Sequence, residues 1–119
     1  MGWTRWTELA SKDYHFANQI EYQGPAVYEL GVRGRYRKYV TTVYVGETGD
    51  LKSRMTSYAL DGSHLKKYAV KYWKMGYKLF FRFQKVNAKS RAKNLQNELL
   101  NRFGLEKYPW NNNFGNGEG

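Results

Sequence analysis

The segment from Val43 to Tyr58 most constrains how this chain can fold. Its first residues alternate β-branched and aromatic side chains, which is typical of a strand. Two glycines then bracket a turn, and Asp50 is suited to cap the helix that follows. Arg54 and Tyr58 are four positions apart and therefore neighbours on one helical face. The segment thus predicts a strand–turn–helix unit in which two phenols, Tyr44 and Tyr58, and one guanidinium are placed to hold a phosphate.

The other strand and helix patterns predict a small α+β domain. We expect strands at 26–32, 40–46 and 78–86, and helices at 51–60, 64–75 and 88–103. A hairpin through the basic loop 33–39 would place Tyr28 across from Tyr44, with Ala26, Leu30 and Thr42 on the same face. The order ββααβα favours a three-stranded, mainly antiparallel sheet flanked by helices.

The two ends of the chain are predicted from weaker patterns. Trp3, Trp6 and Leu9 are spaced for one face of a short helix. We therefore expect residues 1–24 to be an N-terminal extension packed on a main domain at 25–113. The tail, 114–119, is rich in Asn and Gly and is expected to be flexible.

The charge of the chain points to a polyanionic partner. The formal net charge is +10, and residues 62–97 contain ten Lys or Arg and no Asp or Glu. Such a surface favours nucleic acid as the partner. No apolar run is long enough for a membrane span, no signal-peptide pattern opens the chain and cysteine is absent. We expect a cytoplasmic or nucleoid-associated protein that is not secreted, with no membrane partner.

Several common hydrolytic sites are excluded by the residues that the chain lacks. His15 and His64 are far apart in sequence, so there is no paired-histidine metal motif. After Asp61 the acidic residues are only Glu98, Glu106 and Glu118, too few for a carboxylate-rich two-metal site. Neither a Gly-x-Ser-x-Gly elbow nor a phosphate-binding P-loop is present.

The remaining candidates become informative only when they are taken together. Singly, Tyr28 and Tyr44 are ordinary strand aromatics, Arg54 is an ordinary helix arginine, and Glu98 could pair with Arg102. In order, however, Ala-Val-Tyr at 26–28, Val-Tyr-Val-Gly at 43–46, the arginine ten residues after Tyr44, a helical glutamate and Trp-Asn at 110–111 resemble a GIY-YIG nuclease domain. The resemblance covers residues 25–113.

The resemblance implies a phosphodiesterase that works with one divalent metal, Mg²⁺, for which Mn²⁺ can substitute. The positions that match the catalytic residues of the family are Tyr28, Tyr44, Arg54, Tyr58 and Glu98. Glu98 would be the metal ligand, and Asn111 matches the asparagine near the end of the domain. No small-molecule cofactor is implied.

Two positions depart from the family pattern. Ala26 and Val27 replace Gly-Ile, which a strand tolerates because it asks only for small and β-branched residues. Glu47 stands where relatives are often basic, so a helper lysine for the general base is in doubt there. Lys38 and Lys52 both stay open as substitutes.

The chemistry of the candidates is consistent with phosphodiester hydrolysis. A carboxylate such as Glu98 suits Mg²⁺, and Arg54 offers a bidentate fork to phosphate. Tyr28 is the candidate general base. A free phenol has a pKa of about 10, and lowering it to near 7 needs about 4 kcal/mol of differential stabilisation.

Contacts to nucleic acid are expected from the basic loop, the first two helices and the chain end. The residues concerned are Arg35, Arg37, Lys38, Lys52, His64, Lys66, Lys67, Lys71 and Asn111. The lysines of helix 64–75 are expected to contact phosphates rather than bases. For His64 a helix-start role is equally consistent with the sequence.

The predicted function is that of a metal-dependent endonuclease cutting duplex or branched DNA, of phage, mobile-element, repair or restriction type. The alternative is a noncatalytic nucleic-acid-binding module that keeps the fold. A scaffolding role gives no reason for a phosphate-suited cluster on a basic surface. The oligomeric state and the cleavage preference stay open.

Overall fold

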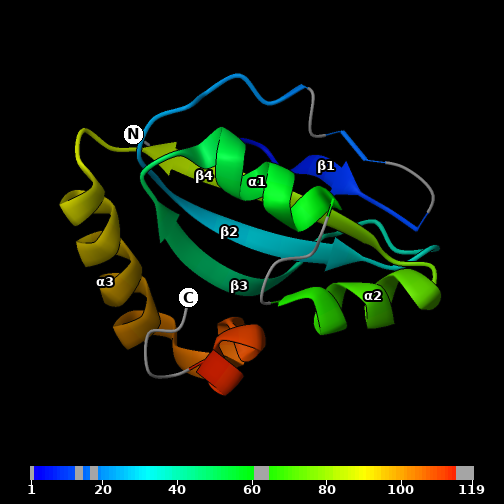
Figure 1. The fold of residues 1–119 in the computed structure, drawn as a ribbon. Coiled ribbons are helices and arrows are strands. Elements are labelled where there is room, and N and C mark those ends of the chain that lie inside the picture. The colour runs from blue at the N-terminus through cyan, green and yellow to red at the C-terminus, as the bar shows by residue number, and fades with distance from the viewer. Residues whose placement is uncertain (1, 13–14, 17–18, 61–64, 115–119) are drawn as a thin grey trace.

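The computed structural model describes residues 2–12, 15–16, 19–60 and 65–114 (Figure 1). In chain order the elements are β1 (Thr7–Ala10), β2 (Ala26–Arg33), β3 (Thr41–Thr48), α1 (Leu51–Leu60), α2 (Lys66–Lys74), β4 (Lys78–Lys85), α3 (Lys89–Lys107) and the 3-10 helix η3 (Pro109–Phe114). The elements predicted between residues 26 and 103 are all present. Within the described ranges, no helix is both long enough and apolar enough to cross a membrane.

The sheet has four antiparallel strands in the order β1-β4-β2-β3. The predicted α+β class is confirmed, but the predicted count of three strands is wrong. The fourth strand is β1, which pairs with β4 through Thr7 and Phe81. This pairing covers an edge of β4 that would otherwise present unpaired backbone groups.

The short helix predicted from Trp3, Trp6 and Leu9 is therefore wrong. Leu9 is fully buried in a strand, and both tryptophan rings lie against the Arg82 guanidinium, at 5.1 Å for Trp3 and 4.5 Å for Trp6. Three-residue spacing fits a helical face, but here strand pairing and cation–π contacts hold the segment instead.

The hairpin of β2 and β3 differs from the predicted register by two residues. Tyr28 lies opposite Gly46, whereas Tyr44 lies opposite Leu30. An irregularity after Leu30 then sets Gly31 opposite Thr42, so Thr42 does not share the face of Tyr28 as predicted. Tyr28 and Tyr44 nevertheless remain on the same face of the sheet.

The two faces of the sheet carry separate helices. On one face, Tyr28 and Leu30 of β2 pack in a core with the buried residues of α1, which are Leu51, Met55, Tyr58 and Ala59. On the other face, Val27 and Val45 form a second cluster with α3, through Leu95, Leu99 and Leu100. In Figure 1, α1 lies over the sheet and runs roughly along β2 and β4, while α3 stands beyond β3. Because Val27 precedes Tyr28, the two clusters lie on opposite faces.

The last helix ends where a glycine was expected to end it. Gly104 has φ +67° and leaves the helical conformation, and one further turn continues to Lys107. Ala92 is fully buried on the packed side of α3. Glu98 is six residues later, about 120° round the helix, and it is exposed to solvent.

Candidate active site

Three buried tyrosines from three elements form a tyrosine cluster. Tyr28 of β2, Tyr44 of β3 and Tyr58 of α1 are each at most 1% exposed. The ring centroids of Tyr28 lie 6.3 Å from Tyr44 and 5.9 Å from Tyr58. The hydroxyls of Tyr28 and Tyr58 are 2.6 Å apart, and a hydrogen bond also joins Tyr44 to Tyr58. The sequence prediction that these phenols converge is confirmed.

Arg54 links the tyrosine cluster to solvent. Its Nη1 donates to the Tyr28 hydroxyl at 3.5 Å, and it also hydrogen-bonds Tyr58. The side chain is half-buried, whereas the three phenols are buried. The guanidinium is therefore the part of this group that an incoming phosphate reaches first.

The start of α1 is firmly fixed, and this holds Arg54 and Tyr58 in place. The Asp50 carboxylate accepts from the backbone N–H of Ser53 at 3.1 Å, which confirms Asp50 as the helix cap. The Leu51 N–H donates to the carbonyl of Gly24 and the Lys52 N–H to that of Tyr22, both at 3.1 Å. The N-terminal segment thus satisfies helix donors that have no partner within α1.

Gly46 allows the phenol of Tyr28 to lie over β3. A Cβ atom built on Gly46 would collide with the Tyr28 hydroxyl and ring carbons. The glycine is therefore required by the close approach of the facing side chain. The sequence indicated the turn but not this contact, because the register error placed Tyr44 opposite Tyr28.

The electrostatics of the tyrosine cluster keep it neutral. Burial raises the pKa of Tyr28 above that of a free phenol, Tyr44 adds to the rise, and the Arg54 charge opposes it. Burial also raises the pKa of Tyr44 and of Tyr58. These phenols are hydrogen-bond donors and acceptors at neutral pH. A general base at Tyr28 needs its pKa lowered, so substrate and bound cation would have to overcome burial as well as the ordinary phenol pKa.

The two candidate carboxylates, Glu98 and Glu47, lie outside the tyrosine cluster. Glu98 is exposed on α3, whose packed side contacts the opposite face of the sheet, so the structure does not bring it into the tyrosine cluster. Among the described side chains of α3, Gln96 hydrogen-bonds β3, donating from Nε2 to the carbonyl of Val45 at 3.2 Å. Glu47 acts on the cluster, because its charge helps to raise the pKa of Tyr44.

The side chains near the tyrosine cluster can be compared with the ligands that a divalent cation requires. Among the residues described, no three His, Cys, Asp or Glu side chains gather at a possible metal site. Mg²⁺ needs only one or two carboxylates, with water and substrate phosphates completing its shell. Glu47 has a buried Oε1 atom without a hydrogen-bond partner among the described residues. Glu47 therefore suits a Mg²⁺ shell that water and phosphate oxygens complete, whereas Glu98 is not brought to the tyrosine cluster.

Asn111 has a different position from the one expected of a nucleic-acid contact. It is 8% exposed, and its side-chain amide pairs with both backbone groups of Val45 at 3.0 Å. The amide thus completes the outer edge of β3, and this use engages its Oδ1 and one of its N–H groups. The prediction that Asn111 contacts nucleic acid is not supported by this geometry.

The other predicted nucleic-acid contacts are on the surface. Exposed side chains are found at Arg35, Arg37, Lys38, Lys66, Lys67 and Lys71, and Lys52 is half-buried. The predicted amphipathic character of α2 is confirmed, since Ala69 is buried while its lysines are exposed. His64 lies outside the described residues.

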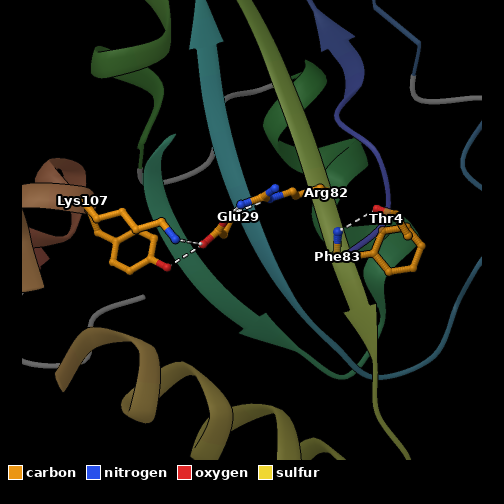
Figure 2. A network of polar contacts seen from close by, with 6 residues as sticks. Thr4, Glu29, Arg82, Phe83 and Lys107 are labelled. Carbon is orange, nitrogen blue, oxygen red and sulfur yellow. Dashed lines mark hydrogen bonds and ion pairs between the residues drawn. The ribbon is translucent and has the colours of Figure 1, made fainter. Parts of the chain in front are cut away.

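A second polar group, not foreseen from the sequence, lies on the α3 side of the sheet. The fully buried Glu29 carboxylate accepts from Arg82 Nε at 2.8 Å and from the Tyr108 hydroxyl at 2.5 Å. Lys107 Nζ lies 3.3 Å from the same carboxylate. Figure 2 shows Arg82 and Lys107 approaching Glu29 from opposite sides. A glutamate within an otherwise apolar strand, 26–32, was the available signal.

Comparison with known proteins identifies one family model that matches a segment of this chain. The model of the family described as GIY-YIG domain-containing protein matches residues 3–74. The match includes β1 to α2, and with them the tyrosine cluster and Arg54, whereas Glu98 and Asn111 lie beyond it. No curated protein matches the chain significantly, and no solved structure does.

The matched segment is more than half of the chain, and it contains the tyrosine cluster and Arg54. The chain belongs to the GIY-YIG domain family, which is a nuclease-type family.

Proposed function

We propose that this protein is a metal-dependent endonuclease that hydrolyses phosphodiester bonds in duplex or branched DNA. The observation that carries the proposal is the contact between Arg54 and the tyrosine cluster. A half-buried guanidinium is hydrogen-bonded to buried phenols in a chain of net charge +10. Such a group binds a phosphate and stabilises charge that develops on it.

The side chains of the site have distinct roles in this proposal. Arg54 binds the phosphoryl oxygens and holds the scissile bond against the cluster. Tyr58 fixes the orientation of the Tyr28 hydroxyl through a hydrogen bond, and Tyr44 in turn hydrogen-bonds Tyr58. Tyr28 accepts the proton of the attacking water, and the nearby guanidinium favours its ionised form.

The metal would be held by Glu98, by Glu47, or by both. When bound, a divalent cation such as Mg²⁺ neutralises phosphate charge and lowers the pKa of a water ligand. Of these two carboxylates, Glu47 is the one whose charge affects a phenol of the cluster, because it helps to raise the pKa of Tyr44. Glu98 is the one that the family resemblance indicates.

A cleavage assay tests the proposal. The purified protein is incubated with supercoiled, linear, branched and single-stranded DNA, with Mg²⁺, with Mn²⁺ or with EDTA. We expect nicking or cutting that EDTA abolishes. Arg54→Ala should lower the rate by about 100-fold or more, as loss of one transition-state contact does.

The carboxylate variants identify the metal ligand. Glu98→Ala and Glu47→Gln are compared with Glu106→Ala, a control in which an exposed glutamate of the same helix is removed. Loss of Mg²⁺-dependent cleavage with retained DNA binding identifies a ligand. Full activity in both Glu98→Ala and Glu47→Gln would contradict the metal site.

A noncatalytic nucleic-acid-binding module is the second candidate, and specific observations favour it. The three phenols are at most 1% exposed, and the described α3 side chain that hydrogen-bonds β3, Gln96, is neutral. Salt-sensitive DNA binding without nicking of any DNA form in Mg²⁺ or Mn²⁺ would establish this candidate in place of the first.

A further inference from the structure

We propose that a cavity at the far end of the sheet binds an unpaired segment of the nucleic acid. The cavity, called the loop pocket here, lies between the β2–β3 loop, residue 12 and the turn from α2 into β4, and its volume is about 430 Å³. Its cations would bind backbone phosphates, while Tyr36 and Tyr39 stack on bases. The inference rests on the proposed action on nucleic acid, but not on cleavage itself.

The loop pocket is strongly cationic. Among its described lining residues are six cations and no acidic side chain; the cations are Lys12, Arg33, Arg35, Arg37, Lys74 and Lys78. Of these six, only Lys78 has a carboxylate partner in the described part of the chain, Glu8 at 3.8 Å. Cations that are gathered without carboxylates repel one another unless an anion lies among them.

The backbone itself brings like charges together here. Arg33 lies directly opposite Lys78 in the pairing of β2 with β4. Like charges in that relation destabilise a sheet. The Arg35 guanidinium packs over Gly76, whose φ is +87° and whose missing side chain leaves room for it at 3.2 Å from an ideal Cβ. The loop is thus seated against the end of α2, so its cations face a formed cavity.

Two strongly exposed aromatic rings belong to the β2–β3 loop, which borders the loop pocket. Tyr36 is 90% exposed and Tyr39 is 82% exposed. Tyr36 also lines a shallow depression that shares Arg35, Arg37 and Lys74 with the loop pocket. Aromatic rings next to a basic groove are the arrangement that binds single strands, because every unpaired base offers a face for stacking. Bases in a duplex are already stacked and cannot use these rings.

The position of the loop pocket fits a strand that also reaches the candidate active site. Arg33 is five residues after Tyr28 in the same strand, about 17 Å at ~3.3 Å per residue. A stacked, B-form strand advances ~3.4 Å per nucleotide and an extended unpaired strand advances further, so this span is at most about five nucleotides. The substrate favoured by this geometry has unpaired nucleotides about that far from the bond that is cut.

Binding of labelled oligonucleotides in EDTA tests the inference without cleavage. Fluorescence anisotropy compares a single strand with its duplex. Tyr36→Ala/Tyr39→Ala should raise the Kd for the single strand by about tenfold or more and leave the duplex unchanged. Tyr36→Phe/Tyr39→Phe should retain wild-type affinity, since the ring remains. Unchanged single-strand affinity in the alanine variant would overturn the inference.

The arginines are tested by the salt dependence of single-strand binding. Arg35→Gln/Arg37→Gln should reduce the slope of log K against log[salt] by about 1.4, at ~0.7 for each lost phosphate contact. Arg91→Gln/Lys93→Gln removes the same charge from exposed positions of α3 and should change the slope less. Equal effects of the two pairs would contradict a localised site.

The outcomes separate this inference from the proposed function. Tyrosine-dependent single-strand binding without cleavage supports the loop pocket and removes the nuclease proposal. If the protein cleaves DNA but its single-strand affinity does not depend on Tyr36 and Tyr39, the nuclease proposal stands and the loop-pocket inference is overturned. If inorganic polyphosphate binds as tightly as the single strand, the site is one for anions alone and the inference fails.

Discussion

At the scale of single residues, the relation between Tyr28 and Gly46 holds the candidate active site together. The two residues face each other across β2 and β3, and the phenol occupies the space that any side chain at 46 would need. Through its hydroxyl, Tyr28 also contacts Tyr58 and Arg54. A change at residue 46 is therefore transmitted directly to the group that is proposed to accept a proton.

Gly46→Ala should destabilise the fold by at least about 2 kcal/mol, because the added Cβ would overlap the ring and hydroxyl of the fully buried Tyr28. Urea unfolding measures the change. Gly49→Ala is the matched control, since a Cβ at 49 would meet only the Lys89 side chain at 3.5 Å, an ordinary contact. Equal stability of the two variants would contradict the close approach.

Alkaline pH should unfold the protein through its buried phenols. Their pKa values in the folded state are raised, so stability is fully present below the pKa of free tyrosine, about 10, and is lost as pH rises above it. The free energy of unfolding, measured in urea, should be insensitive to these groups from about pH 7 to 9 and then fall. Tyr58→Phe should make the fall shallower, whereas Tyr36→Phe, at an exposed position, should not.

The sequence predicted the phenols and Arg54 well but the carboxylates poorly. Strand alternation and helical spacing place Tyr28, Tyr44, Arg54 and Tyr58 correctly, since each rule acts over a few residues. The position of Glu98 depends on which side of α3 packs, and that side centres on Ala92 rather than on Leu95. The influence of a single charge such as Glu47 on a neighbouring phenol depends on tertiary placement, which spacing does not fix.

At the scale of elements, the outer edge of β3 is covered by side chains rather than by another strand. Asn111 accepts from the Val45 N–H and donates to its carbonyl, and Gln96 donates to the same carbonyl. These contacts satisfy backbone groups that an edge strand would otherwise leave open. They also fix η3 and α3 against the strand that carries Tyr44.

Asn111→Ala should cost about 2–3 kcal/mol, because it leaves a buried N–H without a partner and removes one of two donors to the carbonyl. Hydrogen exchange at the Val45 amide should accelerate together with this loss. Gln96→Ala should cost less, since the carbonyl keeps Asn111 as a donor. A larger loss in Gln96→Ala than in Asn111→Ala would contradict this order.

The positions of helices and strands were predictable where the local sequence pattern is enough to determine them. The helix 88–103 and its glycine end follow from local rules, and they were found as expected. The segment at Thr7–Ala10 was not, because its identity as a strand depends on β4, which lies some 70 residues later in the chain. The hairpin register was missed because β3 carries one extra residue opposite the step from Leu30 to Gly31. Gly31 was the available signal, since a glycine inside a strand often marks a bulge.

At the scale of the whole molecule, the Glu29 carboxylate joins parts of the chain that are distant in sequence. It lies in β2 and binds Arg82 of β4, Lys107 of α3 and the Tyr108 hydroxyl. Arg82 in turn lies against the tryptophans of the N-terminal segment. One buried charge thus couples the start, middle and end of the chain.

Arg82→Leu should destabilise the protein by about 3 kcal/mol, because it removes one of the cations that compensate a fully buried carboxylate. The N-terminal segment should lose protection in hydrogen exchange as well, since its tryptophans lose their cation. Arg91→Leu is the control; that arginine is exposed on α3, and its change should stay within about 0.5 kcal/mol. A result in which both variants unfold alike would contradict the coupling.

The contacts of Asn111 and Gln96 with the outer edge of β3 also have a consequence for synthesis on the ribosome. A nascent chain can form the hairpin of β2 and β3 long before residue 111 has left the exit tunnel. Until then the backbone of Val45 is open to water and to other chains, and such open edges are sites of misassembly. This edge of β3 is therefore closed only when an asparagine made 66 residues after Val45 becomes available.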